Sequence, residues 1–181
     1  MVDPVKYALI EFLAWRQRRF ANPSKEWPPC SVAELTFELG AHTLCGVPTE
    51  APLSEARVFG PADRLVGDNL LYYKLGLEVE CTAARIVGFR VVLDPASRSS
   101  YWERRCRPAR LQLRMLDGSR HLLSRETSEV FVLALFGRPL ETGPVGNDRV
   151  HTFRVGGNMV DSYHEPESGR LVELTVSLWA D

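Results

Sequence analysis

Two segments of this 181-residue chain repeat one alternation of apolar and polar residues, and they constrain its fold more than any other feature. The matched apolar positions, offset by 85 residues throughout, are Val87, Phe89, Val91 and Leu93 in the first segment and Val172, Leu174, Val176 and Leu178 in the second. Period two is the spacing of side chains on one face of a β-strand, and a shift of one residue would turn the whole set to the other face. We therefore expect two strands of an antiparallel sheet whose matched apolar residues face the core.

The two halves of the chain match at further points. Segments 35–39 and 111–115 alternate in the same way, at an offset of 76 residues. Each half then has a short apolar segment that ends in a helix stop, Phe59-Gly60-Pro61 in the first half and Phe136-Gly137-Arg138-Pro139 in the second. Gly just past a helix, with Pro beyond it, is a typical C-terminal signal. This ordered series of matches indicates an internal repeat, in which the second copy has longer loops at 143–148 and 164–169.

These patterns predict an α+β fold class: an N-terminal helix followed by two tandem copies of a small β-β-α-β-β-β unit, mainly antiparallel sheet. The helix is expected to begin at Asp3-Pro4, because Asp caps helices and Pro is tolerated in their first turn. The resulting division of the chain is 1–29 for the N-terminal helix and link, 30–94 for the first repeat unit, 95–108 for an Arg-rich linker and 109–181 for the second repeat unit.

Composition disfavours several classes of partner. The net charge of -1 gives no general attraction to nucleic acid or to an anionic membrane, and no apolar run approaches the roughly 20 residues of a membrane-spanning helix. The N-terminus lacks a secretory pattern, since Glu11 interrupts its apolar stretch. Four cysteines are present, none in a C-x-x-C pair, so we expect free thiols, no zinc site and a cytoplasmic location.

The sequence contains no recognisable catalytic motif: no G-x-S-x-G elbow, Walker loop or dinucleotide fingerprint. The only acidic–histidine group is Asp161, His164, Glu165 and Glu167, which could bind a hard metal or supply a general base. Its Pro, Ser and Gly neighbours favour a polar hairpin loop instead. We therefore predict no catalytic residue, metal or cofactor, and keep these four residues as candidates for partner binding.

The segment between the halves, residues 95–108, has four Arg and one Glu beside Tyr101 and Trp102. Arg and aromatic residues dominate the binding energy of protein interfaces, so Tyr101, Trp102, Arg104 and Arg105 are the other partner-binding candidates. Such residues also suit stacking on single-stranded nucleic acid, although the rest of the chain adds no basic field. The alternative is a solvated linker with one aromatic residue anchored on the core. Function should lie in this joint and in the long loops of the second half, because there the two copies differ.

The order of a short apolar helix, Phe-Gly-Pro and three strands resembles the small α/β unit of BamE and of the β-lactamase-inhibitor protein, which has two such units in tandem. It is also similar to the tandem-unit immunity proteins found beside bacterial polymorphic toxins. The resemblance rests on Phe59-Gly60-Pro61, Tyr72-Tyr73, Phe136-Gly137 and the terminal alternating strands, and it covers about residues 32–94 and 109–179. The chain departs from secreted inhibitors because it has no signal peptide and no obvious disulfides.

This resemblance implies a non-enzymatic bacterial interaction protein, an immunity protein that neutralises an effector toxin by occluding its active site. Two other classes stay open. One is an enzyme or small-ligand-binding protein with a site between the units, which would require Asp161, His164 and Glu165 to converge in a pocket. The other is a nucleic-acid adaptor that uses the Arg-Tyr-Trp linker.

Overall fold

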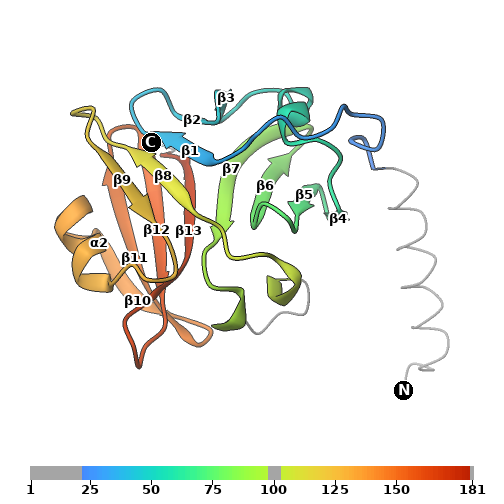
Figure 1. Ribbon diagram of the computed structural model, residues 1–181. Coiled ribbons are helices and arrows are strands. Elements are labelled where there is room, and N and C mark those ends of the chain that lie inside the picture. The colour runs from blue at the N-terminus through green and yellow to red at the C-terminus, as the bar shows by residue number, and fades with distance from the viewer. Residues whose placement is uncertain (1–21, 98–102, 180–181) are drawn as a thin grey trace, which may run out of the picture.

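A computed structural model describes residues 22–97 and 103–179, which form two β-sheets (Figure 1). The strand order is β3-β2-β1-β8-β9 in the smaller sheet and β10-β11-β12-β13-β7-β6-β5-β4 in the larger. The smaller sheet consists of β1 (Leu35–Glu38), β2 (Thr43–Leu44), β3 (Val47–Pro48), β8 (Leu111–Arg114) and β9 (Arg120–Leu123). The larger sheet consists of β4 (Arg64–Val66), β5 (Asn69–Tyr72), β6 (Leu77–Thr82), β7 (Arg85–Val92), β10 (Glu141–Val145), β11 (Asp148–Val155), β12 (Asn158–His164) and β13 (Leu171–Leu178).

Helices contribute little to the described part of the chain. The α-helix α2 spans Glu129–Phe136, and the short 3₁₀ helices η1, η2 and η3 span Leu53–Phe59, Pro95–Ser97 and Glu103–Arg105. Among the described residues, no helix has the length and apolar character needed to span a bilayer. The helix predicted to begin at Asp3-Pro4 lies outside the described residues.

The predicted α+β fold class, with two tandem β-β-α-β-β-β units, is wrong. The protein is mainly antiparallel sheet, and each sheet takes strands from both halves of the chain. In the smaller sheet β1 pairs with β8 in parallel, with Leu35 opposite Leu111. In the larger sheet β7 pairs with β13 antiparallel, with Phe89 opposite Val176. The error has a physical reason: alternation shows which face of a strand is buried, but not which other strand satisfies its backbone groups.

Burial of the matched apolar residues is confirmed at six of eight positions. Phe89, Val91 and Leu93 are buried near the C-terminal end of the first segment, as are their counterparts Val172, Leu174 and Val176 in β13. The exceptions stand at the ends of the paired stretch. Val87 is 40% exposed and lies before the residues of β7 that pair with β13, and Leu178, the last residue of β13, is half-buried.

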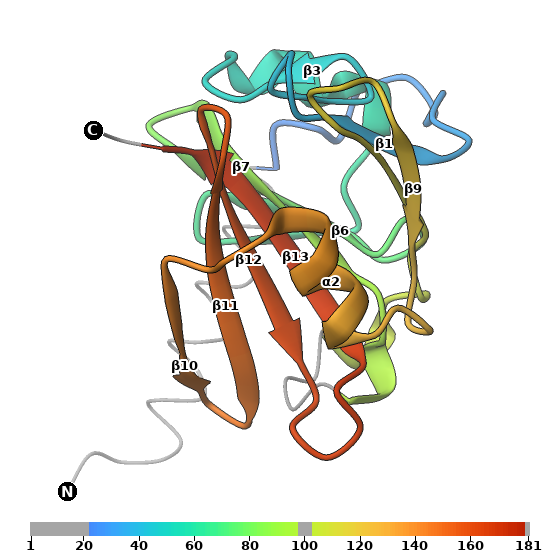
Figure 2. The same cartoon turned by 90° about the vertical axis from the view of Figure 1, so that its left-hand side faces the viewer.

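The core lies between the two sheets, and α2 covers the inner face of the larger sheet beside the smaller one (Figure 2). Phe89 of the larger sheet meets Phe37 of the smaller sheet and Phe59 of η1, with ring centroids 6.2 and 6.5 Å apart in edge-on geometry. From α2, Val132 is fully buried in the same core. The opposite, outer face of the larger sheet therefore carries the polar positions of the alternating strands.

Local signals set the ends of α2. The backbone N–H of Phe131 donates to Ser128 Oγ at 3.2 Å, so Ser128 is a side-chain N-cap. Gly137 follows the helix with a φ of 81°, a left-handed conformation that favours Gly. The sequence signal at Phe136-Gly137 thus does mark a helix end.

Ser128→Ala is expected to lower the free energy of unfolding by about 1 kcal/mol, because it removes the acceptor for the Phe131 N–H. Urea unfolding followed by circular dichroism measures the loss. Ser128→Asp, which keeps a capping oxygen, is the control and should remain within about 0.5 kcal/mol of the wild type. Equal losses in the two variants would show that the cap is not the cause.

Candidate functional site

A cleft of about 550 Å³ lies over the outer face of the larger sheet. Strand pairing places its floor residues in rows. One row runs from Glu80 of β6 through Gly88 of β7 and Ser177 of β13 to Met159 of β12. The next row runs from Glu78 through Arg90 and Thr175 to Asp161 on the same four strands. The floor is therefore made by two strands from each half of the chain.

In the first of these rows the two middle positions, Gly88 and Ser177, have small side chains. Gly88 lies in the interior of a central strand, where a Cβ atom would stand 3.0 Å from Glu80 Oε2 and 3.1 Å from the Val176 carbonyl oxygen. Thr175 and Ser177 lie beside it and line the cleft. Gly inside a strand often marks a place where a ligand or another backbone approaches closely.

The walls of the cleft come from two segments outside the strands of the floor. Ser97 of η2 and Glu103 of η3 stand on one side, and both belong to the joint between the halves. The hairpin between β10 and β11, residues 145–148, also lines the cleft. The sequence comparison identified this joint and this loop as regions where the halves differ, and the structure brings the two together.

A buried ion cluster holds the joint against the sheet. The Arg90 guanidinium contacts Glu173 at 2.6 Å, Glu103 at 2.5 Å and Glu78 at 3.1 Å. The three carboxylate side chains are only 1–7% exposed, and that of Arg90 is 20% exposed. Burial by itself would lower the pKa of Arg90, but the charges of the three glutamates outweigh it and raise that pKa. Because Glu103 belongs to η3, this cluster fixes one wall of the cleft.

Two further carboxyl groups stand in the cleft. Burial and the neighbouring charge of Glu78 raise the pKa of Glu80, although Arg90 opposes the shift. Burial also raises the pKa of Asp161, although Asp161 accepts a hydrogen bond from Thr152 Oγ1 at 2.6 Å. Acidic side chains therefore outnumber basic ones among the described residues that line the cleft. The basic residue Arg90 is already bonded to three glutamates. The arrangement favours a cationic ligand.

The predicted acidic–histidine group does not converge. Asp161 faces outward into the cleft, whereas His164, three residues along the same strand, is fully buried on the inner face. Successive strand residues point to opposite faces, so residues three apart cannot share one. Glu165 and Glu167 lie in the hairpin after β12, and Glu167 is exposed. The alternative of an enzyme or small-ligand site required Asp161, His164 and Glu165 to converge in one pocket, and these residues do not do so.

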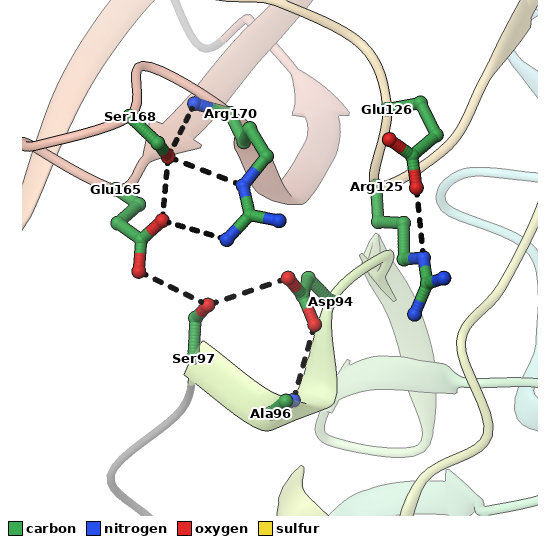
Figure 3. Close-up of polar contacts among 8 residues, drawn as sticks. All are labelled: Asp94, Ala96, Ser97, Arg125, Glu126, Glu165, Ser168 and Arg170. Carbon is green, nitrogen blue, oxygen red and sulfur yellow. Dashed lines mark hydrogen bonds and ion pairs between the residues drawn. The ribbon is translucent and has the colours of Figure 1, made fainter.

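Glu165 is used in local structure. Its carboxylate accepts hydrogen bonds from Ser168 Oγ at 2.5 Å and from Arg170 Nη2 at 3.0 Å (Figure 3). Ser97 Oγ in η2 lies between Glu165, at 3.5 Å, and Asp94, at 3.3 Å. These contacts tie the β12–β13 hairpin to the joint. Glu165 therefore has a positioning role near the cleft wall.

His164 belongs to a buried polar network under α2. Its Nε2 lies 3.0 Å from Ser162 Oγ, and its ring centroid lies 5.4 Å from that of His151. His151 Nε2 in turn lies 2.7 Å from Glu129 Oε1 in the first turn of α2. Burial lowers the pKa of His164 to about 4, although the charge of Glu129 opposes the shift. This network anchors α2 to the sheet and does not open into the cleft.

The candidates from the linker are only partly described. Tyr101 and Trp102 lie outside the described residues. Arg104 and Arg105 are exposed on η3, and the Arg105 guanidinium carbon lies 5.9 Å from the ring centroid of Tyr73. Neither Arg lines the cleft. Their neighbour Glu103 does, and it is the residue of the joint that sequence reasoning missed.

The missed residues share one signal. Glu78, Glu80, Arg90 and Glu173 occupy the polar positions of strongly alternating strands, a pattern that ordinarily indicates a solvated face. The clue in the sequence was that these strands carry charges of both signs. Opposite charges on neighbouring strands of a sheet can form a buried ion cluster, as Arg90 and its glutamates do here. In the described ranges 22–97 and 103–179, no group of three or more His, Cys, Asp or Glu side chains could hold a metal ion.

Comparisons with known proteins leave the function open. No protein-family model matches the chain, and no curated protein matches it. It is similar to the crystal structure of a DUF4309 family protein (YjgB) from Bacillus subtilis, with a TM-score of 0.46 and 11% sequence identity over 92% of this chain and 97% of that chain. A similarity at this level identifies neither a family nor an activity.

Proposed function

We propose that this chain is a non-enzymatic binding protein that engages a protein partner through the cleft on the larger sheet. The observation that supports this best is the construction of the cleft: a rigid floor of four paired strands, bordered by the joint and by the β10–β11 hairpin. Loops held on a rigid scaffold are where binding residues concentrate. The sequence resemblance suggests the class of partner, a bacterial effector toxin that the protein would neutralise by occlusion.

The ion cluster favours this role energetically. Because Glu103 is bound to Arg90 at 2.5 Å, the wall that it forms is held in place without a partner. A preorganised surface loses less conformational entropy on binding than a mobile one. Stable protein interfaces bury about 800 Å² on each partner, so the outer parts of the joint and hairpin would contribute as well as the cleft.

A small-molecule site is the other candidate, because the cleft falls within the range of about 300–1,000 Å³ typical of ligand pockets. Such pockets are lined mainly by apolar and aromatic side chains. This cleft instead presents Glu80, Glu103 and Asp161 with Thr175 and Ser177. The charged and hydroxyl lining favours the polar surface of a protein partner.

The proposal is tested by co-expressing the full chain with the product of each adjacent gene in a bacterial host. We expect one of these products to be toxic alone, to be neutralised by this chain and to co-purify with it. Ser177→Trp, which fills the floor of the cleft without a change of charge, should abolish both protection and co-purification. Ser54→Trp, at an exposed position on η1, is the matched control.

Thermal unfolding of both Trp variants establishes that they fold. The proposal is wrong if no adjacent gene product binds the wild-type chain. The assignment of partner binding to the cleft is wrong if the Ser177→Trp variant folds and still protects as well as the wild type.

A further inference from the structure

The outer surface of α2 is apolar. After Glu129, every side chain of this helix is apolar. Val132 points into the core and is fully buried, whereas Val130 and Phe131 are 76% and 42% exposed and Ala134 is exposed as well. A helix at the surface of a protein ordinarily presents polar residues to water. We therefore expect another apolar surface to cover this side of α2.

The exposed residues Val130, Phe131 and Ala134 form one face, which we call the α2 outer face. Residues three and four positions apart lie on the same side of a helix, as Ala134 does relative to the other two. The Phe131 ring is held in place by His121 of β9, with ring centroids 6.0 Å apart in edge-on geometry. A contiguous exposed apolar surface of this kind marks a site of protein interaction.

A matching apolar surface is predicted in the first 21 residues of the chain, which lie outside the described residues. Its members, which we call the N-terminal stripe, recur at the spacing of one helix face and are Val5, Ala8, Leu9, Phe12 and Leu13. A single amphipathic helix is marginal in water unless its apolar face packs on another surface. The N-terminal stripe thus requires an apolar partner, and the α2 outer face offers one.

The described chain fixes where the N-terminal segment starts from. Asn22 Nδ2 donates to the Ala62 carbonyl oxygen at 3.3 Å, and the Ala62 N–H donates at 2.8 Å to Oγ of the fully buried Ser24. Ala62 lies just before β4, the strand at one edge of the larger sheet. In Figure 1, β4 and α2 lie at opposite sides of the molecule.

The predicted N-terminal helix keeps its stripe close to this anchor. Asn22-Pro23 ends the helix, because the residue before a proline disfavours the helical conformation. Each helical residue advances about 1.5 Å, so the farthest residue of the stripe, Val5, is about 26 Å from Asn22. The α2 outer face at the far side of the same copy is therefore out of reach, whereas that of a neighbouring copy is accessible.

We infer that the N-terminal stripe of one copy docks on the α2 outer face of a second copy, and that the contact is reciprocal. A two-fold axis then relates the copies, so that each gives one helix and receives one. The buried apolar area is twice that of a single helix contact. The dimer goes beyond the proposed function, because α2 and the cleft lie on opposite faces of the larger sheet and partner binding stays possible.

The full chain is tested by sedimentation velocity at micromolar concentration, where we expect a dimer. Val130→Asp and Leu9→Asp should each raise the dimer dissociation constant about 100-fold or more, because each would bury an unpaired carboxylate in an apolar contact. Leu116→Asp, at a residue 57% exposed in another part of the molecule, and Gln17→Asp, outside the stripe, are the matched controls and should leave it unchanged. Asp is favourable in the first turn of a helix, so Val130→Asp should fold, and thermal unfolding checks all four variants.

Mixing the two defective variants distinguishes this contact from other dimers. The Val130→Asp copy retains an intact stripe and the Leu9→Asp copy retains an intact α2 outer face, so one of the two contacts can form between them. With one variant labelled by ¹⁵N, native mass spectrometry should show a heterodimer, although each variant alone is monomeric.

Three results would overturn the inference. A monomeric wild-type chain would exclude a second copy as the occupant of the α2 outer face. A Leu9→Asp variant that stays dimeric would show that the N-terminal stripe does not form the contact, for example because two α2 helices pair directly. The absence of a heterodimer in the mixture would exclude docking of the stripe on α2.

These outcomes are separate from the test of the proposed function. A Val130→Asp variant that is monomeric and still neutralises the toxin would support both assignments, since the two surfaces are distinct. Loss of the toxin complex in Ser177→Trp alone would leave the dimer contact unaffected.

Discussion

Arg90→Met is expected to lower the free energy of unfolding by about 3–5 kcal/mol, the loss typical when one partner of a buried ion pair is removed. Met occupies much of the same volume, so a cavity contributes little. The loss arises because Glu78, Glu103 and Glu173 remain buried without the cation that now contacts all three. Urea unfolding at pH 7 measures it.

Arg114→Met is the matched control. Arg114 contacts Glu38 at 3.6 Å, but these side chains are 46% and 41% exposed. Exposed pairs contribute about 0–1 kcal/mol because water and salt screen them, so this variant should stay close to the wild type. A loss of less than about 1 kcal/mol in Arg90→Met would mean that the buried carboxylates find other compensation.

Acidity should partly rescue the Arg90→Met variant. With the guanidinium absent, protonation of the buried carboxylates removes their mutual repulsion and their desolvation cost. The difference in stability between variant and wild type should therefore shrink as the pH falls from 7 to 5. A difference that is constant with pH would show that lost packing, and not uncompensated charge, explains the destabilisation.

His164 should make the stability of the wild type fall by about 3 kcal/mol between pH 6.5 and pH 4. Burial lowers its pKa from 6.5 to about 4 in the folded protein. In this range the unfolded chain binds a proton at this residue and the folded protein does not, so protons favour unfolding. Each pKa unit corresponds to about 1.4 kcal/mol.

The contribution of His164 is isolated by comparing the pH dependence of unfolding in the wild type and in His164→Gln. The variant has no titrating group at this position, so its stability should fall less between pH 6.5 and pH 4. Direct titration of the imidazole by nuclear magnetic resonance provides the second measurement. Equal pH slopes in the two proteins, or an imidazole that titrates near pH 6.5, would contradict the expected shift.

Glu129 adds a second acid-sensitive contribution of the same sign. Burial would raise its pKa, but hydrogen bonds from His151 and Arg149 outweigh this and lower it. A carboxyl group with a lowered pKa stabilises the folded state above its unfolded pKa and loses that contribution as the pH falls. Acid should therefore loosen α2 from the sheet, while Glu80 and Asp161, whose pKa values are raised, oppose the trend within the cleft.

The candidate site was only partly predictable from the sequence. Asp161 was among the predicted binding residues and does line the cleft. His164 was predicted to belong to the same group as Asp161 because the two are close in the chain. In the β-strand, however, their side chains point to opposite faces of the sheet. Glu80 and Arg90 were missed because a polar residue on an alternating strand is ordinarily solvated, and only the packing of η3 over the sheet buries the Arg90 cluster.

By itself, the sequence determined where strands form and which faces of them are buried, as Phe89, Val91, Leu174 and Val176 show. That information is local, because period two follows from the geometry of a single strand. Only the tertiary structure decided that β7 lies beside β13 and β1 beside β8, so that each sheet joins the two halves and the cleft forms across their boundary. Such neighbours are chosen by the packing of the whole chain, since many strands offer equivalent backbone hydrogen-bonding groups and local sequence does not distinguish among them.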